Sequence, residues 1–316
     1  MLSKIRTQGV EIDVRGNKTK EIQTQFIELT HPLERCLVLP KRNNNIFATI
    51  AETMWVLSGR SDLDFLGQYL KRAHEFSDDG RTWRAGYGGR LRNWNGIDQL
   101  SQVRKILASD FNSRRAVISL FDPDRDFVES NDIPCNNWLH FMCRDGKLHL
   151  NVAARSTDIV WGFSGINAFE WSILQEIMAY WLGIEVGSFG FFTSSLHIYE
   201  RHYGFLHDPL GDEGDQTIYH GDPYIPRFAT KWEDFDHTIG EWFTVEEEIR
   251  TGQHAFELKS VTFHDPLLLQ FIQMMDIYWS HQRQMPRSLI EEKIKELNAS
   301  DLSLAATEFI NRMHNT

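Results

Sequence analysis

The sequence predicts an α+β fold, because strand-like and helix-like segments alternate irregularly along its 316 residues. Two segments carry this prediction. Residues 138–156 read as a β-hairpin, with Asp145 and Gly146 as the turn between two runs of alternating apolar residues. Residues 167–183 read as a central helix, because apolar residues recur at helical spacing nearly all round it and Gly183 ends the pattern.

The remaining elements follow from local signals. Asn44 or Asn45 can cap a helix, and Asp265 followed by Pro266 is typical of a helix start. In chain order, we expect a half-buried strand over 6–16, a helix over 43–59, a buried strand over 113–123, a strand over 188–202, loops over 205–240, and helices beginning at Asp265 and near Asp301. No repeat or flexible linker interrupts the chain, so we predict a single domain over 1–316 with a weaker C-terminal part.

Composition narrows the class of protein. Hydrophobic residues make up 41% of the chain, which suits a globular protein with a sizeable core. The net charge of −11 argues against a broad nucleic-acid surface. The chain has three cysteines, no recognisable signal peptide and no run of ~20 apolar residues, so we expect a cytoplasmic protein that does not cross a membrane.

The three cysteines differ in their surroundings. Cys36 and Cys143 read as small core residues, and Cys143 lies inside an apolar strand. Cys135 instead stands between Pro134 and Asn136, where a strand begins, so polar groups surround it. It is a candidate for a reactive thiol, because such thiols are partly exposed and lie near positive charge. The alternative is a third core cysteine.

Several polar residues stand where strands or helices begin or end. Each has a simple structural explanation: Arg155 could be a surface charge, Asn167 a helix cap, and His197 a buried histidine with its own hydrogen bonds. Their order along the chain points to a shared site. The residues in question are Arg155, Ser156, Asp158, Asn167, His197 and Tyr199.

In order and spacing these residues resemble the thymidylate synthase family, which includes the pyrimidine-nucleotide hydroxymethylases. The most specific matches are Pro134-Cys135, the run Arg155 to Asp158, Gly162, Asn167 and the run His197 to Tyr199, with one extra residue between Gly162 and Asn167. The resemblance covers a core over residues 1–205, and residues 206–316 are divergent. It implies a homodimer in which large mixed sheets pack back to back, here with extra C-terminal helices.

The resemblance also implies a reaction. The substrate would be a pyrimidine nucleoside 5′-monophosphate, and 5,10-methylenetetrahydrofolate would donate one carbon to carbon 5 of its ring. Cys135 would add to carbon 6 as a thiolate and so make carbon 5 nucleophilic, with Arg155 lowering the pKa of the thiol. Glu52 would act as the general acid and base, because partial burial raises the pKa of a carboxyl. Tyr87 would assist removal of the proton from carbon 5.

Further residues would bind the substrates. The phosphate would be held by Arg6, Arg155 and Ser156, with Arg114 and Arg115 entering from the other subunit. His197 and Tyr199 would bind the sugar hydroxyl, Asn167 would read the edge of the base, and Asp158 would contact the pterin. Asn136 stands where the family has a histidine next to the nucleophile, in the region that contacts the nucleotide.

Four departures bear on the product. Asn136 replaces that histidine, and Ala154 replaces a glutamine. In the segment 71–88, Ala73 and Phe76 stand roughly where thymidylate synthases have tryptophans that pack on the folate, and Trp83 does not align well with them. The family's closing C-terminal tail is not recognisable. A wetter site would let water add to the exocyclic methylene intermediate, so we predict a hydroxymethylase.

Alternatives remain at this point. The protein could be a divergent thymidylate synthase or an inactive nucleotide-binding homologue. Asn167 favours uracil, because phage deoxycytidylate hydroxymethylases have aspartate there, but cytosine and a ribonucleotide stay open. We predict no metal, since the spacing of Asp212, Asp215, His220 and Asp222 matches no compact site.

Overall fold

The computed structural model describes residues 1–39, 42–207, 217–252 and 263–314. The chain divides into two compact units: Met1–Arg35 with Ala51–Gly214, and Cys36–Ile50 with Asp215–Thr316. The single domain over 1–316, with a family-like core that ends at residue 205, stays a prediction. In the structure, the unit that holds the C-terminal part also takes up residues 36–50.

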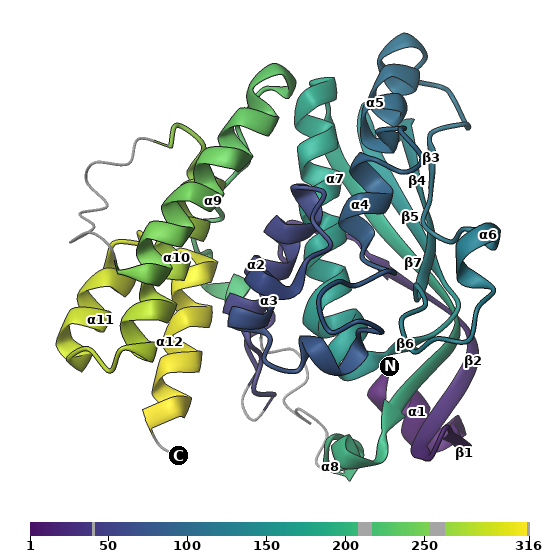
Figure 1. Ribbon diagram of the computed structural model, residues 1–316, viewed down its shortest axis with the longest axis horizontal. Helices are drawn as coiled ribbons and strands as arrows, with labels where there is room; N and C mark the ends of the chain where they lie inside the picture. Colours follow the sequence, from purple (N-terminus) through teal and green to yellow (C-terminus); the bar gives the residue numbers. More distant parts are fainter. Residues whose placement is uncertain (40–41, 208–216, 253–262, 315–316) are drawn as a thin grey trace. The chain divides into compact units, whose positions relative to one another are not determined.

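The first unit is built on a seven-stranded mixed sheet (Figure 1). The strand order is β1-β2-β7-β5-β4-β3, and β6 pairs with β7 off this path. β7 runs parallel to β5 and β6, and the other pairs are antiparallel. The strands are β1 (Val10–Val14), β2 (Asn17–Leu29), β3 (Val117–Ser119), β4 (Asn136–Arg144), β5 (Lys147–Ala154), β6 (Thr157–Asp158) and β7 (Glu185–Tyr199). The predicted α+β class and its large mixed sheet are therefore confirmed.

The predicted hairpin is formed by β4 and β5. Asp145 and Gly146 have φ angles of 51° and 74°. Positive φ at both central residues is what a two-residue hairpin turn requires. Leu148, Leu150 and Val152 all point to the buried face. This hairpin fixes the start of β4, and Cys135 lies immediately before it.

Two predicted strands differ from the structure, and both lie at the edges of the sheet. The N-terminal strand begins only at Val10, because residues 6–8 belong to the helix α1 (Leu2–Gln8). Val10 and Val14 are exposed rather than half-buried, since β1 is an edge strand among the described residues. The strand predicted over 113–123 is reduced to β3, which forms the opposite edge of the described sheet.

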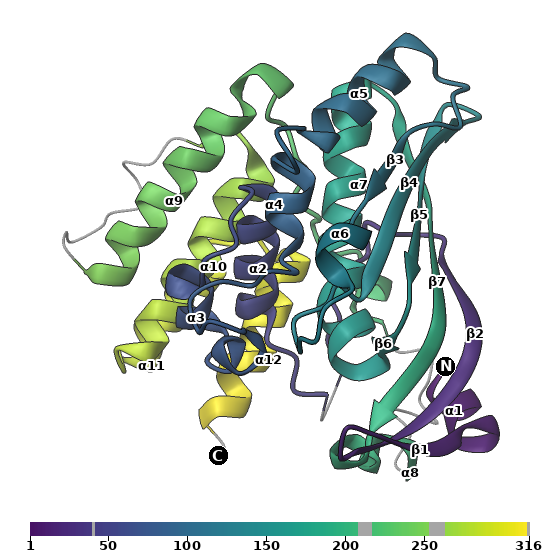
Figure 2. The same ribbon diagram turned by 45° about the vertical axis from the view of Figure 1, so that its right-hand side comes forward.

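Helix α7 (Ala168–Leu182) is the predicted central helix. It follows a π-helix, η2 (Ile159–Asn167), and ends at Gly183, whose left-handed backbone (φ 67°) closes the last turn. α7 packs on β5 and β7. The helices α4 (Tyr87–Arg92) and α5 (Gln99–Ser109) lie on the same side of the sheet as α7 (Figure 2).

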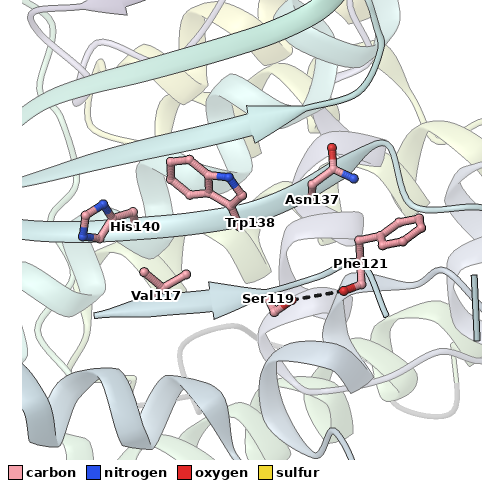
Figure 3. A pocket seen from close by; sticks show the side chains of 6 residues that line it. All are labelled: Val117, Ser119, Phe121, Asn137, Trp138 and His140. Atoms are coloured by element: carbon pink, nitrogen blue, oxygen red, sulfur yellow. Dashed lines mark hydrogen bonds between the residues drawn. The ribbon is translucent and has the colours of Figure 1, made fainter. Parts of the chain in front are cut away.

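The other face of the sheet carries exposed apolar side chains. The strand register aligns Phe26 on β2 with Phe192 on β7, Phe192 with Ala153 on β5, and Ala153 with Trp138 on β4. Phe26, Phe192 and Trp138 are exposed. Figure 3 shows a hollow at the β3–β4 end of this face, lined by Val117, Ser119, Phe121, Asn137, Trp138 and His140.

The second unit is helical in its described part. Its helices are α9 (Phe235–Thr251), α10 (Pro266–Gln282), α11 (Arg287–Lys295) and α12 (Asp301–His314). Asp265 caps α10 by accepting the backbone N–H groups of the second and third helical residues, with Pro266 first, as predicted. The loops predicted over 205–240 are interrupted by the end of helix α8 (Gly204–His207) and by the 3-10 helices η4 (Ile218–Gly221) and η5 (Trp232–Asp234), and the prediction is wrong from residue 235, where α9 begins. Residues 208–216 lie outside the described residues.

The division between the units falls within helix α2 (Ile46–Leu57). Asn45 caps this helix, because its side chain accepts the N–H of Ala48 at 3.2 Å. In the second unit, the ring of Phe47 lies 5.0 Å from that of Phe309 and 5.5 Å from that of Tyr278. The apolar start of α2 therefore forms part of that unit's core. Within the described ranges, no helix combines the length and apolar character needed to cross a membrane.

Candidate active site

A cavity of about 450 Å³ in the first unit collects residues that are far apart in the sequence. They come from α2, α4, η2, the segment before β4, and the ends of β6 and β7. Eight of the predicted site residues line it: Glu52, Tyr87, Cys135, Ser156, Asp158, Asn167, His197 and Tyr199. The ends of strands and helices thus meet at one place, as their order in the sequence indicated.

The thiol of Cys135 is exposed in this cavity. Nη2 of Arg155 lies 3.8 Å from its Sγ, and carbonyls of the chain just before Cys135 hold the guanidinium there. Enclosure by protein raises the pKa of the thiol, and the positive charge of Arg155 lowers it by less. The arginine acts in the predicted direction, but the loss of solvation inside the cavity outweighs it. The thiol is therefore protonated at neutral pH in the free protein and must lose its proton before it attacks.

Glu52 is the carboxyl of the cavity. It lies on the second half of α2 and is 9% exposed. Burial raises the pKa of its carboxyl from the usual 4.5 to about 7. A carboxyl with a pKa near the working pH can both give and take a proton, which is what general acid–base catalysis requires.

Tyr87, at the start of α4, is positioned by hydrogen bonds from Asn136. Its phenol oxygen accepts a hydrogen bond from Nδ2 of Asn136 at 2.7 Å and one from the backbone N–H of Asn136 at 3.1 Å. Asn136 is 0% exposed and is not among the residues that line the cavity. It therefore acts on the site through Tyr87. Burial and the charge of Cys135 raise the pKa of Tyr87 well above its usual range, so the phenol stays neutral.

A buried ion pair fixes α4. Nη1 of Arg90 lies 2.6 Å from Oδ2 of Asp126, and Nη2 lies 2.8 Å from Oδ1. Both side chains are 0% exposed. Asp126 ends the short helix α6 (Pro123–Asp126), so the pair ties two loop-rich segments together. Since Tyr87 lies one turn before Arg90, this bidentate contact also sets the position of the phenol.

Asp158 has a structural role in addition to its place in the cavity. Its carboxylate accepts the backbone N–H groups of Val160 at 3.1 Å and Trp161 at 2.9 Å and so caps η2. Asp158 on β6 lies opposite His197 on β7. A contact with the pterin stays a prediction for this residue.

His197 and Tyr199 lie on one face of β7, as their spacing predicts. Their ring centroids are 5.2 Å apart, and both rings are half-buried. Burial lowers the pKa of His197, although the charge of Asp158 acts in the opposite direction, so the imidazole is neutral at pH 7. Asn167 has helical backbone angles and makes no capping hydrogen bond, so capping does not explain it. Its side chain lines the cavity instead.

Only part of the predicted phosphate site is assembled in one chain. Ser156 lines the cavity, and Arg155 lies beside Cys135. Arg6, Arg114 and Arg115 are exposed and do not line the cavity. A contribution of Arg114 and Arg115 to another subunit stays a prediction, and Arg6 is not brought to the site.

The cavity has an aromatic wall, of which Trp161 was not anticipated from the sequence. Trp83, Phe76 and Trp161 line the cavity. The ring centroids of Trp83 and Phe76 are 6.4 Å apart, with one ring edge-on to the other. The indole N–H of Trp83 donates to the carbonyl of Ala73 at 2.8 Å, which orients the ring. Ala73 itself is buried. The cavity therefore has tryptophans. A lack of tryptophan beside the folate cannot be used to favour a hydroxymethyl product over a methyl product. The aromatic residues within 71–88 were the available signal.

Two arginines of the cavity were also missed. Arg72 and Arg201 both line it, and the guanidinium carbon of Arg201 lies 4.2 Å from the ring centroid of Tyr199. Across the described ranges, no cluster of three or more His, Cys, Asp or Glu side chains is placed to hold a metal ion. Asp212 and Asp215 lie outside the described residues.

Comparisons with known proteins identify the family of this chain. The family model for thymidylate synthase matches residues 1–217. A deoxyuridylate hydroxymethyltransferase of Bacillus phage SP01 is 41% identical over 65% of this chain, and the match spans 56% of that protein. Proteins of the same name from Pseudomonas phage M6 and Delftia phage PhiW-14 are 31% and 32% identical, over 98% and 74% of this chain and 90% and 69% of their own lengths. Other relatives are named thymidylate synthase. This chain belongs to the thymidylate synthase family.

Proposed function

We propose that the protein transfers a one-carbon unit from 5,10-methylenetetrahydrofolate to carbon 5 of deoxyuridine 5′-monophosphate and releases the 5-hydroxymethyl nucleotide. The observation that carries this proposal is the convergence of Cys135, Glu52 and Tyr87 in one cavity. The choice of product rests on relatives named deoxyuridylate hydroxymethyltransferase, one of which matches 98% of this chain. The choice of uracil also rests on Asn167, whose amide offers a donor and an acceptor to the base edge.

The residues have distinct tasks in this reaction. Cys135 adds to carbon 6 of the pyrimidine and leaves again at the end, which a sulfur nucleophile does well. Glu52 exchanges protons with the ring, because its raised pKa leaves it partly protonated near neutral pH. Tyr87 faces the same cavity as a neutral phenol and assists removal of the proton from carbon 5.

The aromatic wall fits the folate. Trp83, Phe76 and Trp161 offer flat apolar surfaces next to the reactive thiol, which suits a pterin ring. When bound, 5,10-methylenetetrahydrofolate supplies the carbon that is transferred. The cavity arginines Arg72 and Arg201 add positive charge around this wall, which suits the carboxylates of the cosubstrate, and Asp158 adds a hydrogen-bond acceptor for the pterin.

The two candidate products differ in what becomes of the folate. A hydroxymethylase returns tetrahydrofolate, whereas a thymidylate synthase returns dihydrofolate. We expect that incubation of the protein with deoxyuridine 5′-monophosphate and methylenetetrahydrofolate consumes the nucleotide without the rise in absorbance that dihydrofolate gives. Mass spectrometry should then find a nucleotide heavier by one CH₂O group. An absorbance rise that matches nucleotide consumption would instead identify a divergent thymidylate synthase.

The proposal includes a homodimer formed through the open face of the sheet. The exposed row of Phe26, Phe192 and Trp138, with the hollow beside it (Figure 3), is an apolar surface of the kind that subunits cover. Arg114 and Arg115 are exposed in the segment that leads into β3, where they can reach a second subunit. Sedimentation equilibrium tests the proposed homodimer by giving the mass of the protein in solution.

A catalytic thiol also needs a reducing compartment, in line with a cytoplasmic location.

A further inference from the structure

A second carboxyl is buried behind the cavity. Glu170 lies on α7, one helical turn after Asn167, and is 1% exposed. Neither of its carboxyl oxygens has a hydrogen-bond partner in the part of the chain that the structure describes. Glu176 on the same helix is equally buried, but it forms an ion pair with Arg35. Glu170 therefore lacks the compensation that a buried carboxylate normally has.

The surroundings of Glu170 connect it to the site. The carboxyl of Glu170 lies close enough to Glu52 for the charge on Glu52 to raise its pKa, in addition to the larger effect of burial. The charge of Glu170 in turn acts on Tyr87. The next residue, Trp171, packs its ring on that of Tyr87 with centroids 5.3 Å apart. Glu170 is thus buried next to Trp171, which packs on Tyr87, and its charge is coupled to those of the two residues that the proposed reaction uses for proton transfer.

We propose that Glu170 is a positioning residue that acts through Glu52, and that the two carboxyls hold one proton between them while the enzyme works. An ionised pair would place two negative charges in a buried site, which is unfavourable. Glu170 is the member that keeps its proton, because it is the more deeply buried of the two. Glu52 is the member that exchanges its proton with the nucleotide. This inference rests on the proposed function, since Glu52 is the group through which it operates.

The other titratable groups near the pair do not change its charge. The phenol of Tyr87 faces it from α4, and burial raises the pKa of that phenol. The thiol of Cys135 lies across the cavity, and its pKa is also raised. Both are neutral around the pKa of Glu52, which is about 7. Because Glu170 stays neutral, the carboxylate that Glu52 forms each time it gives up its proton meets no second negative charge from Glu170.

Infrared spectroscopy of the full chain tests the shared proton without relying on activity. As the pH rises through the pKa of Glu52, the intensity of the carbonyl-stretch band of protonated carboxyls should fall by the amount that about one carboxyl contributes. At a pH about two units higher, the band of one protonated carboxyl should remain. Glu170→Gln should remove this remaining signal. Glu52→Gln should move it to lower pH, because Glu170 then titrates without the charge of Glu52. Glu176→Gln is the matched control and should leave the remaining signal in place.

Kinetics provide the second measurement. Glu170→Gln should lower kcat by about 10- to 100-fold and should leave the KM for the nucleotide within about twofold. The loss is smaller than the roughly 100- to 10,000-fold that direct general acid–base assistance contributes, because Glu170 acts through Glu52. Glu170→Asp keeps the carboxyl and should retain both the infrared signal and more of the kcat. A purely structural residue would instead show losses that follow stability and would leave the infrared titration unchanged.

Two results would overturn this inference. One is a wild-type protein with no protonated carboxyl above the pKa of Glu52. The other is a folded Glu170→Gln variant that keeps both the high-pH signal and the wild-type kcat. A wild-type protein without folate-dependent turnover would contradict the proposed function instead, and the infrared titration would still decide whether the carboxyls share a proton.

Discussion

Replacing Cys135 by serine should reduce the release of tritium from carbon 5 of labelled deoxyuridine 5′-monophosphate by at least about 1,000-fold. Release of this proton requires that carbon 5 first become nucleophilic, which the covalent addition at carbon 6 achieves. A serine hydroxyl at this position is a far weaker nucleophile than a thiolate. Because Cys135 is exposed in the cavity, the substitution should leave the free energy of unfolding nearly unchanged.

Cys143 offers the matched control. It lies on β4, the strand that begins directly after Cys135, but its side chain is buried in the core. Cys143→Ser should lower stability, because it buries a hydroxyl, and should leave tritium release by the folded protein close to wild type. Tritium release by Cys135→Ser at the wild-type rate would remove Cys135 from the mechanism.

Replacing Arg90 by methionine should lower the free energy of unfolding by about 3–5 kcal/mol. The substitution leaves the carboxylate of Asp126 buried without its bidentate partner. The midpoint of unfolding in urea, with the slope of the transition, measures the effect. Lys147→Met is the matched control, because Lys147 pairs with Glu185 on the surface, where an ion pair contributes only about 0–1 kcal/mol. Equal losses in the two variants would contradict the structural role given to Arg90.

The loss in Arg90→Met should also depend on pH. Burial alone would raise the pKa of Asp126, but the hydrogen bonds and charge of Arg90 outweigh it and hold the pKa below its usual value. A group with a lowered pKa in the folded state stabilises the protein above its unfolded pKa of about 3.9 and loses this effect as the pH falls. The difference in stability between wild type and variant should therefore be largest at neutral pH and shrink in acid.

The parts of the fold that the sequence predicted well are those with a strong local pattern. The β4–β5 hairpin has a turn that only a few residue pairs adopt, and α7 and α10 carry clear terminal signals. Strand β2 and helix α9 were missed, because both mix polar residues into their apolar pattern. Their apolar positions become evident only from the elements they pair with or pack on.

The candidate site shows the same division. Cys135 and His197 stand at strand ends within a recognisable series, so their meeting in one cavity could be predicted. Asn136 could not be placed correctly, because its contact with Tyr87 joins segments about fifty residues apart. Glu170 gave no signal at all, since a glutamate on a helix is normally solvated. Only the packing of α7 against the cavity reveals that its carboxyl is buried.

Mass spectrometry of the protein with 5-fluorodeoxyuridine 5′-monophosphate and methylenetetrahydrofolate tests the central claim most directly. Fluorine at carbon 5 cannot leave as a proton does, so the reaction should stop with the nucleotide bonded to sulfur and the transferred carbon in place. The proposed mechanism predicts this adduct on the peptide that contains Cys135. A protein that turns over deoxyuridine 5′-monophosphate yet carries no adduct on Cys135 would contradict it.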